Sequence, residues 1–133
     1  MPEKKTVTRA RRAKREGKAP TTQAGEFVRE EIEHIRAGKH GARSTKQAIA
    51  IGLSKARRAG VKLKPPPKGR TSESTRRSAQ RAYAAGQALP GREPSPRRSK
   101  VTLRAFKREP RDAASSKALS RQARERPRRR TAA

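Results

Sequence analysis

Cationic side chains dominate this chain so strongly that only a short stretch of it can bury a core. The 133 residues include 38 Lys or Arg and 11 Asp or Glu, which gives a formal net charge of +27. Hydrophobic residues make up 29% of the chain and aromatic residues 2%, so one core cannot extend over its whole length. High net charge with low hydrophobicity is typical of disordered segments. We therefore expect a small folded unit flanked by disordered basic arms.

The charge is distributed unevenly along the chain. Residues 1–20 carry eight basic and two acidic side chains, residues 21–63 nine and four, and residues 64–133 twenty-one and five. This division predicts a basic N-terminal arm at 1–20, a folded core at 21–63 and a disordered tail rich in Pro, Ser, Arg and Ala at 64–133. Stretches of the tail such as "STRRSAQRAYAAGQAL", with Ala79, Ala82, Tyr83 and Gly86 in line, bury too little to form more than short transient helices.

The core has the pattern of two amphipathic helices, at about 22–37 and 45–59. Gly38 stands where a glycine commonly ends a helix, and Thr21 or Thr22 is the expected N-cap. Ser44, followed three residues later by Gln47, forms a capping box that marks the second helix start. The predicted fold class is mainly α, with these helices forming a small hairpin. The apolar residues at helical spacing in the first helix are Ala24, Phe27, Val28, Ile32 and Ile35.

Two residues do not fit this simple hairpin. Glu31 lies within the apolar arc of the first helix and therefore needs a cationic partner, for which Arg57 and Lys46 are candidates. Ile51 points away from the predicted helix contact. Because a hairpin of roughly 40 residues is marginally stable alone, we expect help from weak self-association through Ile51 and a small-residue edge. That edge consists of Ala48, Gly52 and Ala59.

Basic residues near the second helix start predict a phosphate-binding site. The stretch "GKHGARSTKQ", at 38–47, combines two glycines, three cations and the free amides of a helix N-terminus, which together suit one backbone phosphate. The alternative is a solvated loop leading into a capped helix. The predicted nucleic-acid contacts in the whole chain are Lys39, Arg43, Lys46, Lys55, Arg57, Arg58, Arg97, Arg98, Arg128, Arg129 and Arg130.

Two further patterns bear on nucleic acid. "PSPRR", at 94–98, resembles the Ser-Pro-basic-basic turns of linker-histone tails, which lie along the DNA minor groove; a charged Pro-rich spacer is the alternative. A helix-turn-helix reader is disfavoured, because the connection from Gly38 to Ser44 is longer than its usual turn.

Residues suited to catalysis or metal binding are scarce. The chain has no Cys and only two histidines, His34 and His40, without a carboxylate cluster at ligand spacing. We therefore predict a protein that is not an enzyme, with no catalytic residues, no metal and no cofactor. The longest apolar run, at 48–53, is far too short to span a membrane. No secretory signal is recognisable, and the expected location is the cytoplasm, on the nucleoid.

These observations favour a largely sequence-nonspecific, histone-like DNA-binding protein that neutralises phosphates. Single-strand binders stack bases on aromatic side chains, and this chain has only Phe27, Tyr83 and Phe106. Duplex DNA is therefore the favoured partner. An RNA-binding or ribosome-associated protein is the first alternative. An assembly protein that uses the acidic first helix is the second.

The core also resembles a known group of sequences. "TQAGEFVREEIEHIRAGKHGARSTKQAIAIGLSKARRAGVKL", at 22–63, is similar to a family of short, basic, functionally uncharacterised bacterial proteins, often proteobacterial and sometimes labelled DNA-binding. The part "KHGARSTKQAIAIGLSKARRAG" carries most of the resemblance. It implies a bacterial source and adds some support for DNA binding, but it identifies no site residue. The tails are similar to bacterial histone-H1-like proteins in composition only.

Overall fold

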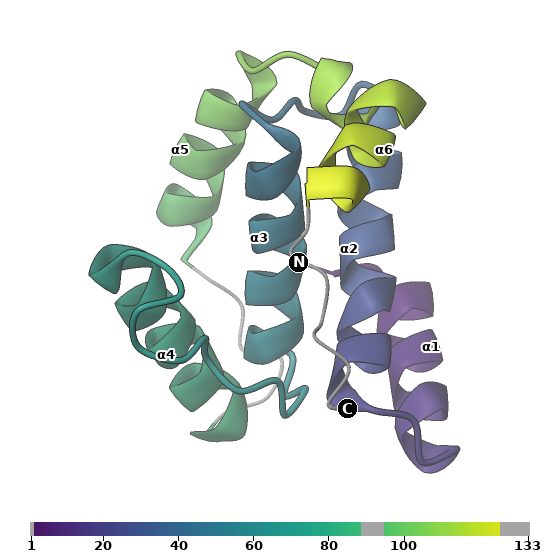
Figure 1. Cartoon of the computed structure of the whole chain (residues 1–133), viewed down its shortest axis with the longest axis vertical. Coiled ribbons are helices and arrows are strands. Elements are labelled where there is room, and N and C mark those ends of the chain that lie inside the picture. Colours follow the sequence, from purple (N-terminus) through teal and green to yellow (C-terminus); the bar gives the residue numbers. More distant parts are fainter. Residues whose placement is uncertain (1, 89–94, 126–133) are drawn as a thin grey trace.

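The computed structural model describes residues 2–88 and 95–125, and the fold is mainly α, as predicted. Within these residues there is no strand. Figure 1 shows α3 in the middle of the molecule, with α2 and α1 on one side and α4 and α5 on the other. The helices are α1 (Lys4–Arg15), α2 (Pro20–Arg36), α3 (Thr45–Arg58), α4 (Glu73–Ala88), α5 (Pro96–Lys107) and α6 (Ser116–Glu125), with a short 3-10 turn η1 (Asp112–Ala114) before α6.

The two predicted core helices are confirmed as α2 and α3. The predicted Thr cap of α2 is wrong, because the helix begins at Pro20, whose missing N–H costs nothing at the first helical position. The cap of α3 is confirmed, since Ser44 Oγ accepts the Gln47 N–H at 3.1 Å. The Gln47 side chain accepts the N–H of Arg43 at 2.6 Å. Local hydrogen bonding therefore sets the end of the interhelix loop where α3 begins.

The hairpin core is divided into two apolar clusters. Phe27 of α2 and Ala56 of α3 share the first cluster. Ile35 and Ala48 share the second, together with alanines from the C-terminal region. Between the clusters, in the middle of α2, lies the fully buried Glu31. A charged site thus interrupts the apolar contact between the two helices.

The small-residue edge of α3 is used inside the hairpin. A Cβ added at Gly52 would lie 2.6 Å from the Cα of Val28, so only glycine permits this approach of α3 to α2. Ala48 is also completely buried. The expectation that this edge mediates self-association is therefore wrong for Gly52 and Ala48, because a helix of the same chain already covers them.

The N-terminal region differs from the predicted disordered arm. Residues 4–15 form α1, which packs against α2. Thr6, Ala10 and Ala13 are buried, and Ala10 joins the cluster around Phe27. Alanine has little apolar area, but its small size lets two helix backbones approach closely. This contact brings the start of α1 beside the acidic face of α2.

The tail also differs from the predicted disorder where the structure describes it. Ala79, Ala82 and Gly86, which the sequence aligns on one face, are buried where α4 packs against α3. A Cβ at Gly86 would overlap the carbonyl oxygen of Arg57. None of the residues of α5 is buried.

Residues 111–114 fasten the C-terminal region to the hairpin. Ala113 and Ala114 are buried in the second apolar cluster. Thr45 Oγ1 donates to the carbonyl of Ala113 at 2.6 Å, and Arg36 Nε donates to that of Ala114 at 2.8 Å. Arg111 in turn donates to the carbonyl of Ile35 at 3.3 Å, near the end of α2. These bonds hold η1 against α2 and α3.

In the described part of the chain, no helix combines the length and apolar character needed to cross a bilayer.

Candidate nucleic-acid interface

The loop predicted to cradle a phosphate is already occupied by another part of the chain. The N–H of Gly41 donates to the carbonyl of Phe106 at 2.7 Å, and that of Ala42 donates to the carbonyl of Pro110 at 2.9 Å. A Cβ at Gly41 would overlap the carbonyl of Glu109. Segment 106–110 therefore occupies the loop amides of Gly41 and Ala42 and closes this part of the predicted cradle, whereas phosphate binding at the N-terminus of α3 stays a prediction.

Two of the predicted nucleic-acid contacts on α3 have structural positions instead. The Lys55 ammonium forms an ion pair with the buried carboxylate of Glu31. Arg57 is 7% exposed and donates to the carbonyls of Leu63, at 3.1 Å, and Lys64, at 3.3 Å. Burial lowers the pKa of the Arg57 guanidinium. Glu31 does need a cation, as predicted, but its partner is Lys55 rather than Arg57 or Lys46.

Four other predicted contacts in the core keep their charged groups at the surface. Arg43, Lys46 and Arg58 are exposed. Lys39 is exposed too, with its Nζ 3.6 Å from the carboxylate of Glu3. These residues are not gathered into one site, because the loop and the C-terminal end of α3 lie at opposite ends of the helix.

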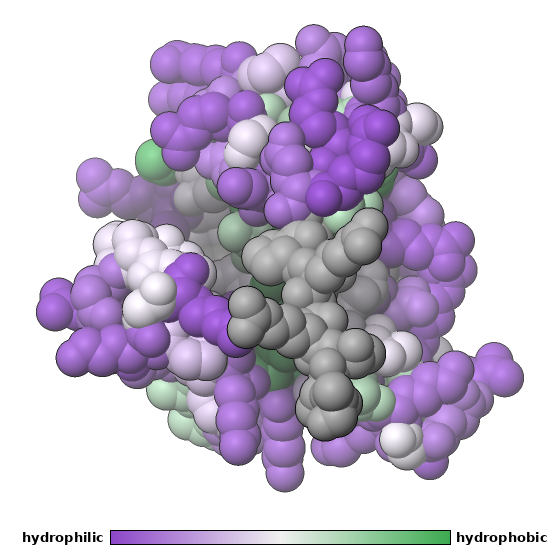
Figure 2. Space-filling view, in the orientation of Figure 1, coloured by the Kyte–Doolittle hydropathy of each residue, from purple (hydrophilic) through white to green (hydrophobic). Residues whose placement is uncertain are grey.

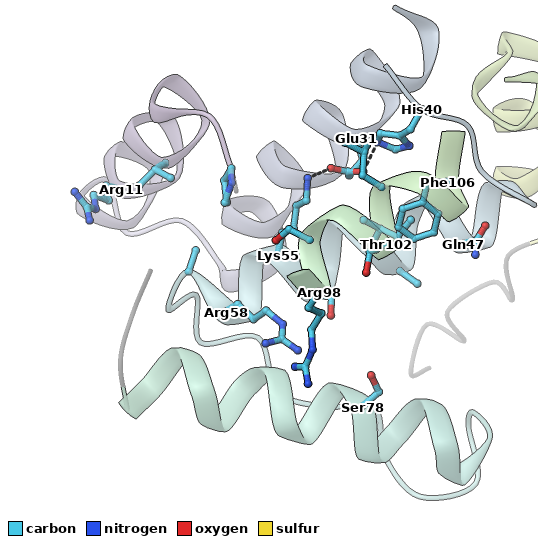
Figure 3. Close-up of a pocket in the computed structure, with 18 residues that line it drawn as sticks. Arg11, Glu31, His40, Gln47, Lys55, Arg58, Ser78, Arg98, Thr102 and Phe106 are labelled. Carbon is cyan, nitrogen blue, oxygen red and sulfur yellow. Dashed lines mark hydrogen bonds and ion pairs between the residues drawn. The ribbon is translucent and has the colours of Figure 1, made fainter. Parts of the chain in front are cut away.

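A hollow of about 640 Å³ lies between α3, α4 and α5 (Figure 3). Arg58 from α3 and Arg98 from α5 both extend into it, and Ser78 of α4 lines the opposite wall. The floor is apolar and includes Ile51, whose side chain the hairpin alone left unexplained. The hollow therefore brings together two predicted nucleic-acid contacts, Arg58 from the core and Arg98 from the tail.

The "PSPRR" stretch contains a helix start. Ser95 Oγ accepts the N–H of Arg98 at 3.2 Å, and Pro96 takes the first helical position of α5. Arg97 and Arg98 are therefore in the first turn of an exposed helix. Residues 95–98 therefore form the start of a helix in place of the predicted turn or Pro-rich spacer, and contact with the minor groove stays a prediction. The predicted contacts Arg128, Arg129 and Arg130 lie outside the described residues.

Hydrophilic residues cover most of the face shown in Figure 2. Glu30 and Glu31 are buried in ion pairs with Lys55, whereas most arginines and lysines of α4 and α5 are exposed. Four further acids of the described residues pair with Lys, Arg or His while their side chains stay 34–50% exposed: Glu3, Glu16, Glu33 and Glu73. This separation leaves an exterior richer in positive charge than the composition alone implies.

Beneath the hollow lies a cluster of carboxylates and histidines that sequence reasoning missed. Glu31 Oε2 is 3.2 Å from His40 Nε2, and Glu31 Oε1 is 4.0 Å from His34 Nδ1. Glu31 and His40 both line the hollow. The spacing of Glu31 and His34, three residues apart on α2, puts them on one helix face. That spacing was the available signal, but nothing local to the sequence shows that the loop returns His40 to the same point.

The N-terminus of α1 completes this cluster. The backbone N–H of Glu3 and the hydroxyl of Thr6 both donate to Glu30 Oε1, at 2.5 and 3.2 Å. His34 Nε2 lies 3.0 Å from Glu3 Oε1. Hydrogen bonds from His34 and Lys5 lower the pKa of Glu3 to about 2, so this carboxylate is ionised at neutral pH. Glu30 on the acidic helix α2 therefore contacts the basic N-terminal region of the same chain.

The fold and surface together define a small helical protein with internal acids and a cationic exterior. Residues 4–69, just under half of the chain, match the model of a family of unknown function (DUF6496). The matching part covers α1, α2 and α3, and so includes Glu30, Glu31, His34 and His40 of the cluster but not Glu3. No curated protein matches the chain, and no solved structure matches it either.

Proposed function

We propose that this protein binds duplex DNA without strong sequence preference, by neutralising backbone phosphates, and that it catalyses no reaction. The observation that supports the proposal most directly is the separation of charge. Acids such as Glu30 and Glu31 are buried in internal pairs, so they do not offset the exposed cations. A surface of this kind attracts a polyanion and releases its condensed counterions on binding.

The aromatic side chains support duplex rather than single-stranded nucleic acid. Phe27 is 1% exposed, as expected from its place in the hairpin. The ring of Phe106 is half-buried, with its centroid 5.7 Å from that of His40. Tyr83 is half-buried on α4. Stacking on unpaired bases requires exposed rings, and the described residues offer none that is fully exposed.

The position of α3 argues against sequence readout by a helix-turn-helix. The second helix of that motif enters the major groove with a free face. Here α3 is packed against α2 on one side and α4 on the other, and it also contacts η1 and α6. Exposed α4 and α5 are better suited to lie along a phosphate backbone, with Arg58 and Arg98 contributing from the hollow.

The salt dependence of binding tests the proposal. If about 8 to 12 phosphates are neutralised, the slope of log K against log salt should lie near −7 to −11. Fluorescence anisotropy of the full chain on labelled duplexes of unrelated sequence provides the measurement. A slope shallower than about −3 would contradict phosphate neutralisation. A strong preference for one duplex would contradict nonspecific binding.

A pair of charge variants locates the contact. Arg98→Gln should reduce the size of the slope by about 1, because one phosphate contact is lost. Arg15→Gln removes an exposed charge from the last turn of α1 and serves as the matched control. An equal effect of the two variants would mean that the α4–α5 side is not a preferred contact surface.

Competition between duplex DNA and structured RNA at one salt concentration separates the proposal from its main alternative. Tighter binding of RNA would favour a ribosome-associated or RNA-binding protein. The assembly alternative predicts oligomers that survive nuclease and high salt. Ile51 is half-buried in the hollow, so its substitution by Ser would then dissociate them. Localisation on the nucleoid follows from the DNA proposal and can be followed by imaging a labelled chain.

A further inference from the structure

We propose that Glu31, His34 and His40 bind one divalent transition-metal ion, with Zn²⁺ as the preferred ion. One ligand atom from each of the three side chains lies within 4.8 Å of the other two. Ligands that surround Zn²⁺ at about 2.1 Å are roughly 3.4 Å apart in a tetrahedron. The 3.2 Å between Glu31 Oε2 and His40 Nε2 is close to that spacing. A small rotation of His34 would complete the set.

The hydrogen bonds of both histidines direct a lone pair into the cluster. His40 Nδ1 is 2.9 Å from the carbonyl oxygen of Gly41. A carbonyl only accepts, so Nδ1 carries the proton and Nε2 faces Glu31. His34 Nε2 lies 3.0 Å from Glu3 Oε1, and donation to this carboxylate leaves Nδ1 facing Glu31. Metal-binding histidines characteristically donate their outer N–H to a carbonyl or carboxylate.

The charge of the cluster also favours a bound cation. Glu30 and Glu31 are 3% and 0% exposed, and both face the single ammonium of Lys55. Lys55 pairs with Glu31 Oε1, whereas the buried Glu31 Oε2 has no hydrogen-bond partner among the described residues. An unpaired carboxylate oxygen is costly to bury. A metal ion on Oε2 would satisfy it without displacing Lys55.

The ligand types select a class of ion. Two imidazoles and one carboxylate suit Zn²⁺ and its neighbours, whereas the chain has no Cys to favour softer ions. Glu31 and His40 line the hollow, which gives the ion a path from solvent and room for a water as fourth ligand. The dashed contacts in Figure 3 show the Glu31 carboxylate between Lys55 and His40.

The ion would link parts of the chain that are distant in sequence. Glu31 and His34 belong to α2. His40 belongs to the loop after α2, whose backbone is hydrogen-bonded to segment 106–110. His40 also contacts the ring of Phe106. Metal binding should therefore hold the loop on α2 and steady the attachment of α5. This role is independent of whether the exterior binds DNA.

Zinc affinity of the untagged full chain tests the proposal. The chain is stripped with EDTA, dialysed and titrated with Zn²⁺ in competition with a chromophoric chelator. One ion per chain is expected for the wild type. His34→Gln and His40→Gln should each weaken binding by at least about 100-fold, beyond the ~10–100-fold typical of changes outside the ligand set. Glu33→Gln, which removes an exposed carboxylate from the same helix, is the control and should bind normally. Equal affinity of all four proteins would overturn the proposal.

Nitrogen NMR of the histidine rings tests it in the wild-type chain, so the result does not depend on a variant folding. Addition of Zn²⁺ should shift His34 Nδ1 and His40 Nε2, and leave protons on His34 Nε2 and His40 Nδ1. Binding through the opposite nitrogens would overturn the proposed geometry. Two imidazolium rings that are unaffected by Zn²⁺ would show that protons, rather than a metal, balance the cluster.

Discussion

The buried Glu31–Lys55 pair provides the most direct test of how this fold is stabilised. The Glu31 side chain is 1% exposed, whereas that of Lys55 is 25% exposed. Removing one partner of a buried pair costs about 3–5 kcal/mol, because the other charge is left uncompensated. Since Lys55 reaches solvent in part, we expect Lys55→Met to cost about 3 kcal/mol, near the lower end of that range. The melting temperature should fall by roughly 10 °C.

The double variant Glu31→Met/Lys55→Met separates the pair from the packing around it. Replacement of a buried pair by apolar side chains of similar volume is often neutral or stabilising, so the double variant should be more stable than Lys55→Met alone. Urea unfolding followed by far-UV circular dichroism, with EDTA present, measures the free energies of unfolding of the wild type, Lys55→Met and the double variant. The control is Arg29→Met, which breaks an exposed ion pair of the same helix and should cost less than about 1 kcal/mol. A Lys55→Met cost no larger than that of Arg29→Met would refute the reasoning.

Three further predictions concern Gly52, Gly86 and Arg57; urea unfolding checks the first and third, and limited proteolysis checks the second. Gly52→Ala should destabilise the hairpin by about 1–3 kcal/mol, because its Cβ meets the backbone of Val28. Gly25→Ala, at an open position of α2, is its matched control and should stabilise by roughly 0.5–1 kcal/mol; equal effects would show that the helices are not closely packed. Gly86→Val should loosen α4 from α3, detected as faster proteolysis within 73–88 with residues 4–58 still protected. Arg57→Met should lower the free energy of unfolding by about 1–3 kcal/mol, because the carbonyls of Leu63 and Lys64 lose their donor. An unchanged free energy would mean that water satisfies these carbonyls equally well.

The hairpin was predictable because its signals are local. Helical spacing and the Ser44 cap determined α2 and α3 to within two residues at each end. Gly38 and Gly60 follow the two helices with φ of 78° and 100°, the left-handed conformation that glycine adopts readily. The need of Glu31 for a cation was also predictable, because burial of a lone carboxylate is costly. Its partner was not, since Lys46, Lys55 and Arg57 all lie on the facing helix and helical spacing alone does not choose between them.

The candidate sites were harder to predict because their contacts span long distances in sequence. The phosphate cradle had the right residue types, but two of its loop amides, those of Gly41 and Ala42, are bonded to segment 106–110, more than sixty residues further along the chain. The basic arms were assigned to disorder on composition. Their helices dock through alanines and Gly86, which give almost no periodic hydrophobic signal.

The sequence by itself determined the mainly helical fold, the two core helices with the Ser44 cap of α3, and the strongly cationic character of the protein. These properties depend on propensity, spacing and composition, which act over a few residues or over the whole chain. Only the tertiary structure decided which charges remain outside. Close packing of small residues brings α1 and the 106–114 segment onto the hairpin, and this buries Glu30, Glu31 and His40 together while Arg58 and Arg98 stay exposed. The cluster and the basic hollow exist because burial depends on which helices meet.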